Sequence, residues 1–392
     1  MSLRPLSIGF IPLVDAAPVI IAHEFGFAEE EGLALELQSA PSWSTLRDML
    51  ALGRIEAAHM LAPVPVAMAL GLGGMATRFD VLSVLSLNGE VIGVSSALAE
   101  RLRGAGHDFG FADARAAGAA LIGAAGARLR VGVPFPFSMH AELLYYWLGA
   151  LGLEAPQALD VRTVPPPLMA EAVAAGEIDA FCVGEPWGSI AVENGVGELL
   201  LPGSAIWAAA PDKVLAVREG WAEADEGRTG RLMRAIWRAG RWLGAPANLM
   251  TASEVLARPG YLNVPAEVIE RGLTGRLVVT ASGEEREAPG FTRFFDGAAC
   301  FPWRSQAAWI GARLAERNGL DRAEAIGKAR AVFRSDLFRA HLGPAGAEIP
   351  GASDKLEGSL DRPVVVAARS GHLILAPDAF FDGAIFDPGA ER

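Results

Sequence analysis

The fold of this chain is decided by residues 176–188, GEIDAFCVGEPWG, where a glycine leads into a short apolar run that ends at Gly-Glu-Pro-Trp. Residues 53–63, GRIEAAHMLAP, follow the same order of glycine, isoleucine, acid, alanine, apolar run and proline. The two stretches begin at residues 53 and 176, an offset of 123 residues. This agreement predicts that part of the chain is duplicated.

The likeness extends beyond these two stretches. At the same offset, LSIGF at residues 6–10 meets LRVGV at residues 129–133, and the alignment needs no gap. Each copy reads as strand, helix, strand, helix, strand. The apolar runs are short and bounded by Gly and Pro, which is typical of parallel strands buried on both faces. A repeat of this length is a half-domain duplication rather than a solenoid unit.

Two duplicated α/β halves predict two lobes around a ligand cleft, followed by helical C-terminal additions. We expect lobe I to contain residues 1–95 and 213–392, and lobe II to contain residues 96–212. Loops at the carboxyl ends of parallel strands converge where a ligand can bind. Gly184 and Pro186 would turn the chain at that cleft, and a purely structural strand end is the alternative.

The later part of the chain adds a short strand at residues 214–217 and two helices within residues 251–273. One further helix is expected within residues 322–343. Residues 363–377, PVVVAARSGHLILAP, form an apolar pair in which RSGH reads as a hairpin or tight turn.

Composition and charge exclude several functions. The chain has 392 residues, of which 51% are hydrophobic, and a formal net charge of -12, which argues against direct nucleic-acid binding or an anionic-membrane surface. Its two cysteines lie far apart without metal-ligand spacing, so we expect reduced thiols and no metal site. The sequence contains no uninterrupted apolar span of about 20 residues, so we expect no membrane insertion.

The first strand is expected at Leu6, which leaves no room for a signal peptide before it. We therefore expect a cytoplasmic protein, and the alternative is an export segment that has been trimmed. The sequence has no GxSxG, HExxH, P-loop or GxGxxG context, so we expect no enzyme activity, no catalytic residues and no cofactor.

Six segments carry a specific resemblance. The longer ones are VPFPFSMHAELLYYWLGALGL at residues 133–153, VPPPLMAEAVAAGEIDAFCVGEPWG at residues 164–188 and HMLAPVPVAMALG at residues 59–71, and the shorter ones are LNVPAEVI at 262–269, FPWRSQAAW at 301–309 and FFDGAIFDP at 380–388. Over nearly its whole length the chain resembles the nitrate- and bicarbonate-binding proteins of the NrtA/CmpA type, and above all the cytoplasmic nitrate sensors of the NasS type. The resemblance implies a periplasmic-binding-protein-like fold of type II, with a small planar oxyanion between its lobes.

This resemblance implies a cytoplasmic nitrate or nitrite sensor that controls a NasT-like RNA-binding antiterminator of nitrate assimilation. One alternative is the substrate-binding component of a nitrate or bicarbonate ABC transporter. A weaker alternative is an enzyme like the thiamine-pyrimidine synthases, although two distant cysteines cannot supply their iron motif.

Nitrate is a flat, weakly basic monoanion, so it needs a positive group, several N–H donors and an apolar or aromatic wall. Lys213, expected just before a strand, matches the lysine that nitrate binders place on the anion, where bicarbonate relatives have an acid. His140 would open a helix with Ser138 as its N-cap and donate an N–H to the anion. Ordinary loop and packing roles are the alternatives.

Two further positions complete the predicted site. Trp43 would form a wall over the flat ligand, with the amide of Ser44 or Thr45 nearby, and simple packing is its alternative. Glu90 lies where nitrate binders have glutamine, and an ionised carboxylate there would repel the anion. Glu90 therefore points away, pairs with Lys213, or stays protonated.

Overall fold

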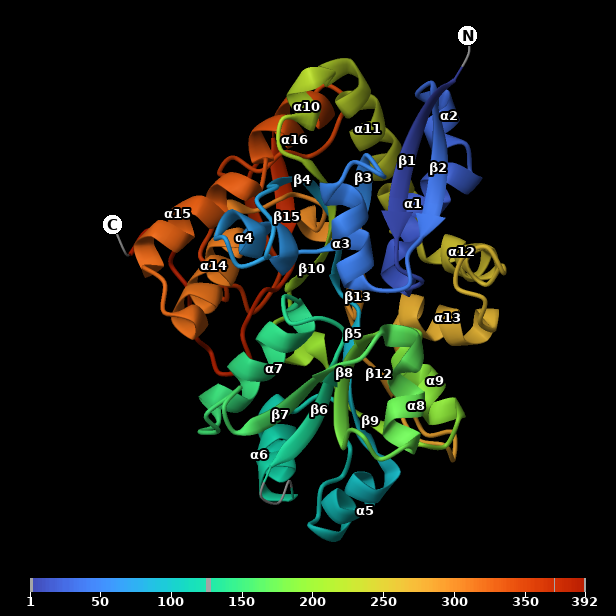
Figure 1. The fold of residues 1–392 in the computed structure, drawn as a ribbon, viewed down its shortest axis with the longest axis vertical. Coiled ribbons are helices and arrows are strands. Elements are labelled where there is room, and N and C mark those ends of the chain that lie inside the picture. Colours follow the sequence, from blue (N-terminus) through green and yellow to red (C-terminus); the bar gives the residue numbers. More distant parts are fainter. Residues whose placement is uncertain (1–2, 125–127, 370, 391–392) are drawn as a thin grey trace.

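The structure, a computed structural model, describes residues 3–124, 128–369 and 371–390. Two β-sheets lie one above the other and form the centres of two lobes (Figure 1). The strands of the upper sheet, in lobe I, are β1 (Arg4–Phe10), β2 (Leu33–Ser39), β3 (Ala57–Leu61), β4 (Phe79–Asn88), β10 (Pro211–Arg218) and β13 (Thr292–Arg293). The strands of the lower sheet, in lobe II, are β5 (Glu90–Ser95), β6 (Leu129–Val133), β7 (Leu159–Thr163), β8 (Ala180–Gly184) and β9 (Gly197–Pro202).

Apart from the short edge strand β13, the two sheets share the same order and directions of five strands, which confirms the predicted duplication. Their strand orders are β13-β4-β10-β3-β1-β2 and β7-β6-β8-β5-β9. In each sheet, the first strand of the copy pairs in parallel with the second and third strands. Ile8 pairs with Ala57, and Val131 pairs with Ala180 at the same offset. The register of the second strand against the first differs by one position between the copies. The predicted alignment without a gap is therefore wrong by one residue at this strand.

A serine side chain caps one helix in each copy, after the second strand in the first copy and after the first strand in the second copy. Ser42 Oγ accepts a hydrogen bond from Thr45 N at 3.2 Å, and Ser138 Oγ accepts one from Ala141 N at 3.1 Å, as predicted for the second cap. The helices of the first copy are α1 (Ala17–Glu24), α2 (Phe27–Glu30), α3 (Trp43–Ala51) and α4 (Pro63–Ala69). Lobe II contains α5 (Ser96–Gly104), α6 (Ala114–Ala124), α7 (Met139–Ala150), α8 (Met169–Ala174) and α9 (Trp187–Glu193).

The central strands are buried on both faces, as the short apolar runs predict. All five residues of β3 and all five of β8 are buried. Because such strands have no solvent-facing side, any polar residue within them must find a partner inside the protein. His59 on β3 is such a residue.

The chain passes between the lobes at Gly89, earlier than the predicted boundary at residue 95. β5 pairs with β8 and β9 of the lower sheet, so it belongs to lobe II. Asn88 and Gly89 have φ angles of 56° and 102°, in the left-handed region, which ends β4 and redirects the chain. The return to lobe I lies between β9 and β10, which begins at Pro211, two residues before the predicted boundary at 213.

A second difference concerns the C-terminal half, which was expected to lie wholly in lobe I. A hairpin of β11 (Arg276–Val278) and β12 (Glu285–Glu287) packs on lobe II, where Leu277 and Val279 join the cluster around Phe181. Apolar burial therefore returns this short segment to the lower lobe before β13 rejoins the upper sheet.

The helical C-terminal additions cover lobe I. α11 packs on α1, and both α14 and α15 pack on α4. The single helix expected within residues 322–343 is divided at Phe333, whose backbone is extended. These helices are α10 (Trp221–Ala224), α11 (Glu226–Leu243), α12 (Leu249–Leu256), α13 (Ala266–Thr274), α14 (Arg304–Asn318), α15 (Arg322–Val332) and α16 (Ser335–Leu342).

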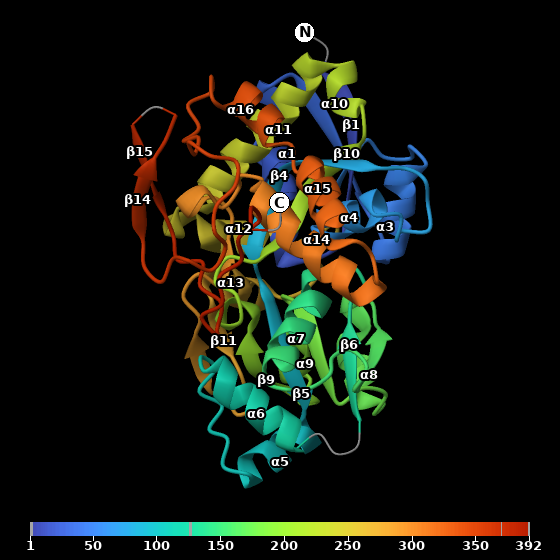
Figure 2. The ribbon, with the colours of Figure 1, turned by 90° about the vertical axis from the view of Figure 1, so that its left-hand side faces the viewer.

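The expected late hairpin is formed by β14 (Val364–Ala367) and β15 (His372–Leu375), which pair antiparallel at the left edge of lobe I in Figure 2. Its turn includes Ser370, which lies outside the described residues. The two cysteines are free thiols, as expected. No helix among the described residues combines the length and apolar character needed to cross a bilayer.

The Gly-Glu-Pro-Trp segment joins the two lobes. The backbone oxygen of Glu185 accepts a hydrogen bond from Val14 N at 2.8 Å, and Trp187 Nε1 donates to Pro12 O at 2.8 Å. The Glu185 side chain is buried at this seam against Gly272 of α13. Strand β8 therefore ends on this sequence because the segment must bind the loop that follows β1 in the opposite lobe.

Glu185 makes stability depend on pH. Burial raises its pKa from 4.5 to about 7, although Ser189 and Arg271 oppose this shift. A raised folded-state pKa stabilises the fold below about pH 4.5, and this stabilisation disappears as the pH rises to about 7. The Glu185→Gln variant cannot titrate at this position. Its stability relative to wild type should therefore improve by up to ~3 kcal/mol between pH about 4.5 and about 8, measured by urea unfolding.

The exposed Glu177 of the same lobe supplies the matched control. Glu177→Gln should follow the wild-type pH dependence. A Glu185→Gln protein whose stability changes with pH as the wild type does would exclude this role for Glu185.

Candidate functional site

Lys213 lies between the lobes with its side chain fully buried. Its Nζ lies 2.8 Å from Asp15 Oδ2 in the 3-10 turn η1 (Val14–Ala16), and it also donates to Asp212 Oδ2. The sequence predicted a lysine just before a strand, but Lys213 lies inside β10 and pairs with Leu61 and Ser86. A buried ammonium group needs such pairing, since an unpaired charge in the interior is strongly unfavourable.

An irregularity in β10 places neighbouring side chains together. The register of β10 against β4 shifts on both sides of Lys213. In a regular strand, successive side chains point to opposite faces, whereas a bulge redirects one of them. The contact between Asp212 and Lys213 is therefore a product of this local distortion of the strand.

The pKa values of the three groups reflect this arrangement. Burial alone would raise the pKa of Asp15, but Lys213 and His59 together lower it to about 2. Burial lowers the pKa of Lys213, and the two aspartates outweigh it and raise the pKa, so the ammonium form is maintained. Burial raises the pKa of Asp212 to about 6, with Asp15 contributing and Lys213 opposing. Asp15 is thus the firmly ionised partner of Lys213.

His59 supports Asp15 from β3. Its Nε2 lies 2.8 Å from Asp15 Oδ1. Burial lowers the pKa of His59 despite the neighbouring carboxylate, so the ring is neutral and its Nε2–H donates to Asp15. The centroid of the same ring lies 5.7 Å from that of Trp43.

Two nitrogen-bearing side chains at the site lack partners. Trp43 Nε1 and both ring nitrogens of His140 are buried without a hydrogen-bond partner among the described residues. His140 is the second residue of α7, as predicted, and its Nδ1 lies 3.7 Å from Asp212 Oδ1. Burial, with Lys213 adding, lowers the pKa of His140 well below its ordinary value, so its ring is neutral. Each side chain therefore has one N–H available to a ligand.

Trp43 also forms a wall beside the ammonium group. It is the first residue of α3, and Lys213 Nζ lies 5.6 Å from its ring centroid. Gly184, at the end of β8, lets lobe II approach the site closely, because it has no side chain. A Cβ added to Gly184 would lie 3.1 Å from Leu13 Cδ2, 3.5 Å from Asp15 Oδ2 and 3.6 Å from His140 Nε2.

Five of the seven predicted residues thus meet at one place: Trp43, Glu90, His140, Gly184 and Lys213. The other two have different local partners. Ser44 Oγ lies 3.0 Å from Ser42 Oγ, within the cap of α3, and Pro186 is the N-cap residue of α9 at the seam.

Sequence reasoning missed Asp15, His59 and Asp212, which hold Lys213 in place. The duplication contained a weak signal for two of them. At the offset of 123 residues, Asp15 takes the position of the cap residue Ser138, and His59 that of Cys182. Asp212 directly precedes the predicted lysine, so an acid was visible beside it.

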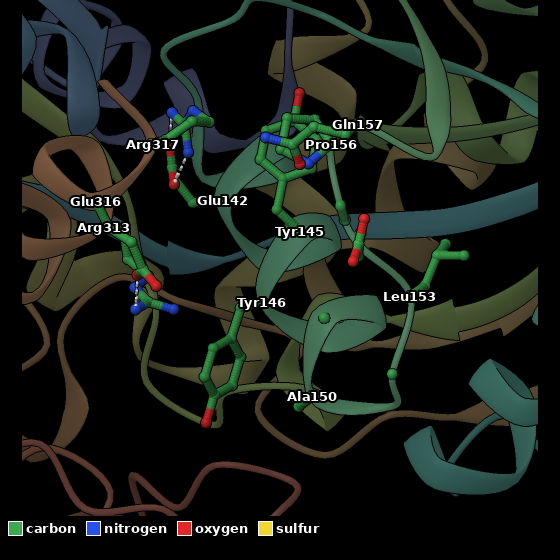
Figure 3. Close-up of a pocket in the computed structure, with 14 residues that line it drawn as sticks. Glu142, Tyr145, Tyr146, Ala150, Leu153, Pro156, Gln157, Arg313, Glu316 and Arg317 are labelled. Atoms are coloured by element: carbon green, nitrogen blue, oxygen red, sulfur yellow. Dashed lines mark hydrogen bonds and ion pairs between the residues drawn. The ribbon is translucent and has the colours of Figure 1, made fainter. Parts of the chain in front are cut away.

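A wide groove lies on the outer side of the same helix α7. It has a volume of about 940 Å³ and is lined by α7, residues 152–157 and the end of α14. Arg317 Nη1 donates to Glu142 Oε2 at 2.7 Å across it (Figure 3). The groove is separate from the buried cluster, although α7 carries both His140 and Glu142. Because α7 belongs to lobe II and α14 packs on lobe I, the width of the groove depends on how the lobes meet.

The arrangement provides groups that can hold a small anion. It offers one ammonium group, two neutral N–H donors and an aromatic wall, all shielded from water. Across residues 3–124, 128–369 and 371–390, no group of three His, Cys, Asp or Glu side chains is arranged to hold a metal ion.

Comparison with known proteins identifies relatives. Residues 2–257 match the model of the NMT1-like family. The nitrate/nitrite binding protein NrtA of Synechococcus elongatus is 31% identical over 399 residues, which cover 98% of this chain and 84% of that protein. The nitrate import ATP-binding proteins NrtC of Synechocystis sp. and Synechococcus elongatus are both 32% identical, and the chain spans only 46% and 50% of their length.

Solved structures agree with these relatives. The periplasmic nitrate-binding protein NrtA from Synechocystis PCC 6803 matches with a TM-score of 0.81 and 27% identity, covering 98% of this chain and 96% of that one. The alkanesulfonate-binding protein SsuA from Xanthomonas axonopodis pv. citri shares the fold, with a TM-score of 0.59 and 19% identity over 83% of this chain and 98% of that one. The predicted periplasmic-binding-protein-like fold is thereby confirmed.

Removing the ammonium group should destabilise the fold. Lys213→Met leaves Asp15 and Asp212 buried beside each other without a cation, which should cost about 3–5 kcal/mol at pH about 8. The loss should be smaller at pH about 5, where the carboxyl groups can take up protons. Urea unfolding measures both values.

Lys328→Met, at a partly exposed position on α15, is the matched control and should change stability by less than about 1 kcal/mol. An equally small effect of Lys213→Met would contradict the role assigned to the buried ion pairs.

Proposed function

We propose that this chain, which belongs to the NMT1-like family and to the NrtA/CmpA-type family of nitrate- and bicarbonate-binding proteins, binds nitrate or nitrite between its two lobes. The observation that carries the proposal is the pair of unpartnered nitrogen side chains, Trp43 and His140, beside the buried Lys213. Buried donors are normally satisfied, so a group that accepts from both is expected there.

The shape of the site suits a flat anion. The Trp43 ring supplies an apolar face, and the Lys213 ammonium group lies near that face. His140 approaches from lobe II, and Gly184 leaves its side of the site free of a side chain. Because the donors come from both lobes, the anion would be held only when the lobes are closed.

Lys213 favours nitrate or nitrite over bicarbonate. By resemblance, the bicarbonate-binding relatives carry an acid where this chain has the lysine. The carboxylates of Asp15 and Asp212 outnumber the single charge of Lys213, so the ammonium group acts mainly through its N–H donors and its fixed position. A dianion such as sulfate would add two negative charges to a cluster that already has more carboxylates than ammonium groups, and we expect the site to reject it.

The relatives favour a role as the substrate-binding component of a nitrate transporter, in which the closed protein presents its anion to a membrane permease. NrtA is a nitrate/nitrite binding protein, and the NrtC proteins are nitrate import ATP-binding proteins. The chain covers about half of each NrtC protein, so a role as part of a transport assembly is a proposal for this chain.

The cytoplasmic sensor with a NasT-like antiterminator stays a prediction, as does the similarity to NasS-type sensors. Both roles use the same binding step and differ in partner and compartment. Fractionation of the native full-length product separates them, since a permease partner requires recovery outside the cytoplasm. Capture of the antiterminator without nitrate, and its release with nitrate, would favour the sensor.

Calorimetric titration with nitrate, nitrite, bicarbonate and sulfate tests the binding step. We expect nitrate or nitrite to bind at about micromolar concentration, which corresponds to about 8 kcal/mol. Trp43→Phe keeps the aromatic wall but loses one N–H donor, so its affinity should fall about tenfold. Lys213→Gln should weaken binding by about a hundredfold or more.

Trp242→Phe, at a half-buried tryptophan on the surface of lobe I, is the control for the indole and should bind as the wild type does. Circular dichroism and a melting curve establish that each variant is folded. Binding of bicarbonate alone, or of none of the four anions, would remove the nitrate assignment.

A further inference from the structure

Glu90 occupies an unusual position at the centre of the molecule. It is the first residue of β5, directly after the crossing at Gly89, and its side chain is fully buried. Neither carboxyl oxygen has a hydrogen-bond partner within the described part of the chain. A Cβ added to Gly203 would lie only 2.0 Å from Glu90 Oε1, so the glycine at 203 makes room for this carboxyl group.

The charged neighbours of Glu90 come from lobe I. Asp212 and Lys213 on β10 and Asp15 in η1 all act on its pKa. Lys213 is already paired with both aspartates. Glu90 is therefore a third carboxyl group in the field of a single ammonium group.

The other titratable groups around the site carry no charge. Burial lowers the pKa of His59 on β3, and it lowers that of His140 on α7 still further. Burial raises the pKa of the Cys182 thiol on β8, the strand that pairs with β5. None of these three groups supplies the positive charge that an ionised Glu90 would need.

A bound monoanion makes this imbalance larger. With Glu90 ionised, the site would contain three carboxylates, one ammonium group and the added anion. Burial raises the pKa of Glu90 well above its ordinary value, and Asp212 contributes in the same direction. The acid form removes one negative charge and provides an O–H donor, which an anion can accept.

We propose that Glu90 holds the proton that accompanies the anion: its carboxylic acid donates a hydrogen bond to the bound anion, so that each anion is bound together with one proton. This inference rests on the proposed anion binding and adds its proton dependence. In an open arrangement, water reaches the carboxyl group and favours its ionised form. Closure over the anion returns the proton to Glu90, and affinity therefore falls as the pH rises.

Proton-linked calorimetry of the full chain tests the inference directly. Nitrate and nitrite are titrated at pH about 6, about 7.5 and about 9, in buffer pairs that differ in ionisation enthalpy. Affinity should fall with pH, approaching about tenfold per pH unit where free Glu90 is ionised. There the apparent enthalpy should vary with the buffer and correspond to uptake of about one proton per anion.

The Glu90→Gln variant tests whether Glu90 carries the proton that is taken up with the anion. Glutamine keeps the size of the side chain and an N–H donor but cannot titrate. Between pH about 7.5 and about 9, above the pKa of about 6 of Asp212, the variant should therefore bind with an affinity and enthalpy that depend on neither pH nor buffer. The exposed Glu177→Gln variant should keep the full wild-type dependence.

The possible results separate the two proposals. Wild-type binding that is independent of pH and buffer would overturn the inference while leaving anion binding intact. A pH dependence that Glu90→Gln retains would overturn it as well, because another group would then carry the proton. If no anion binds the wild type at any pH, the proposed function itself fails. The wild-type measurement decides the question even if Glu90→Gln does not fold.

Discussion

The ion pairs of Lys213 are the interaction on which the centre of this protein depends. An ammonium group is held away from water by Asp15 and Asp212, and His59 holds Asp15 in turn. Buried charges are tolerated only when they are paired and hydrogen-bonded, so each of these residues restricts the others. The bulge in β10 and the buried histidine of β3 have the same cause, since both are needed to bring two carboxylates to one lysine.

The duplication explains why such a cluster lies between the lobes. Each copy of the repeat ends its third strand at the seam, β3 in lobe I and β8 in lobe II. The copies have diverged at equivalent positions: His59 supports Asp15 in one, whereas Cys182 is an apolar core residue in the other. Lobe I thus carries the ion pairs, while lobe II contributes His140, Glu90 and the close backbone approach at Gly184.

Much of the fold was predictable because the repeat, the apolar strands and the Ser138 cap are local signals. The family resemblance added Lys213, His140 and Trp43, which the structure brings together with Gly184 and Glu90. The boundary at residue 89 was missed because β4 and β5 read as one long apolar run, and only the left-handed Asn88 and Gly89 separate them. Asp15 and His59 were missed because their role depends on a tertiary contact between them, and they lie 44 residues apart in the sequence.

Two of the crossings between the lobes lie beside the cluster itself. Gly89 directly precedes Glu90, and the return crossing after β9 ends one residue before Asp212. A rotation of the lobes about these points would therefore have its pivot next to the buried site, while the groove between α7 and α14 lies on the periphery. A small rotation of one lobe would move atoms near the pivot only slightly, so the packing there would be preserved. The same rotation would change the distance between α7 and α14 by a larger amount, because these helices lie farther from the pivot.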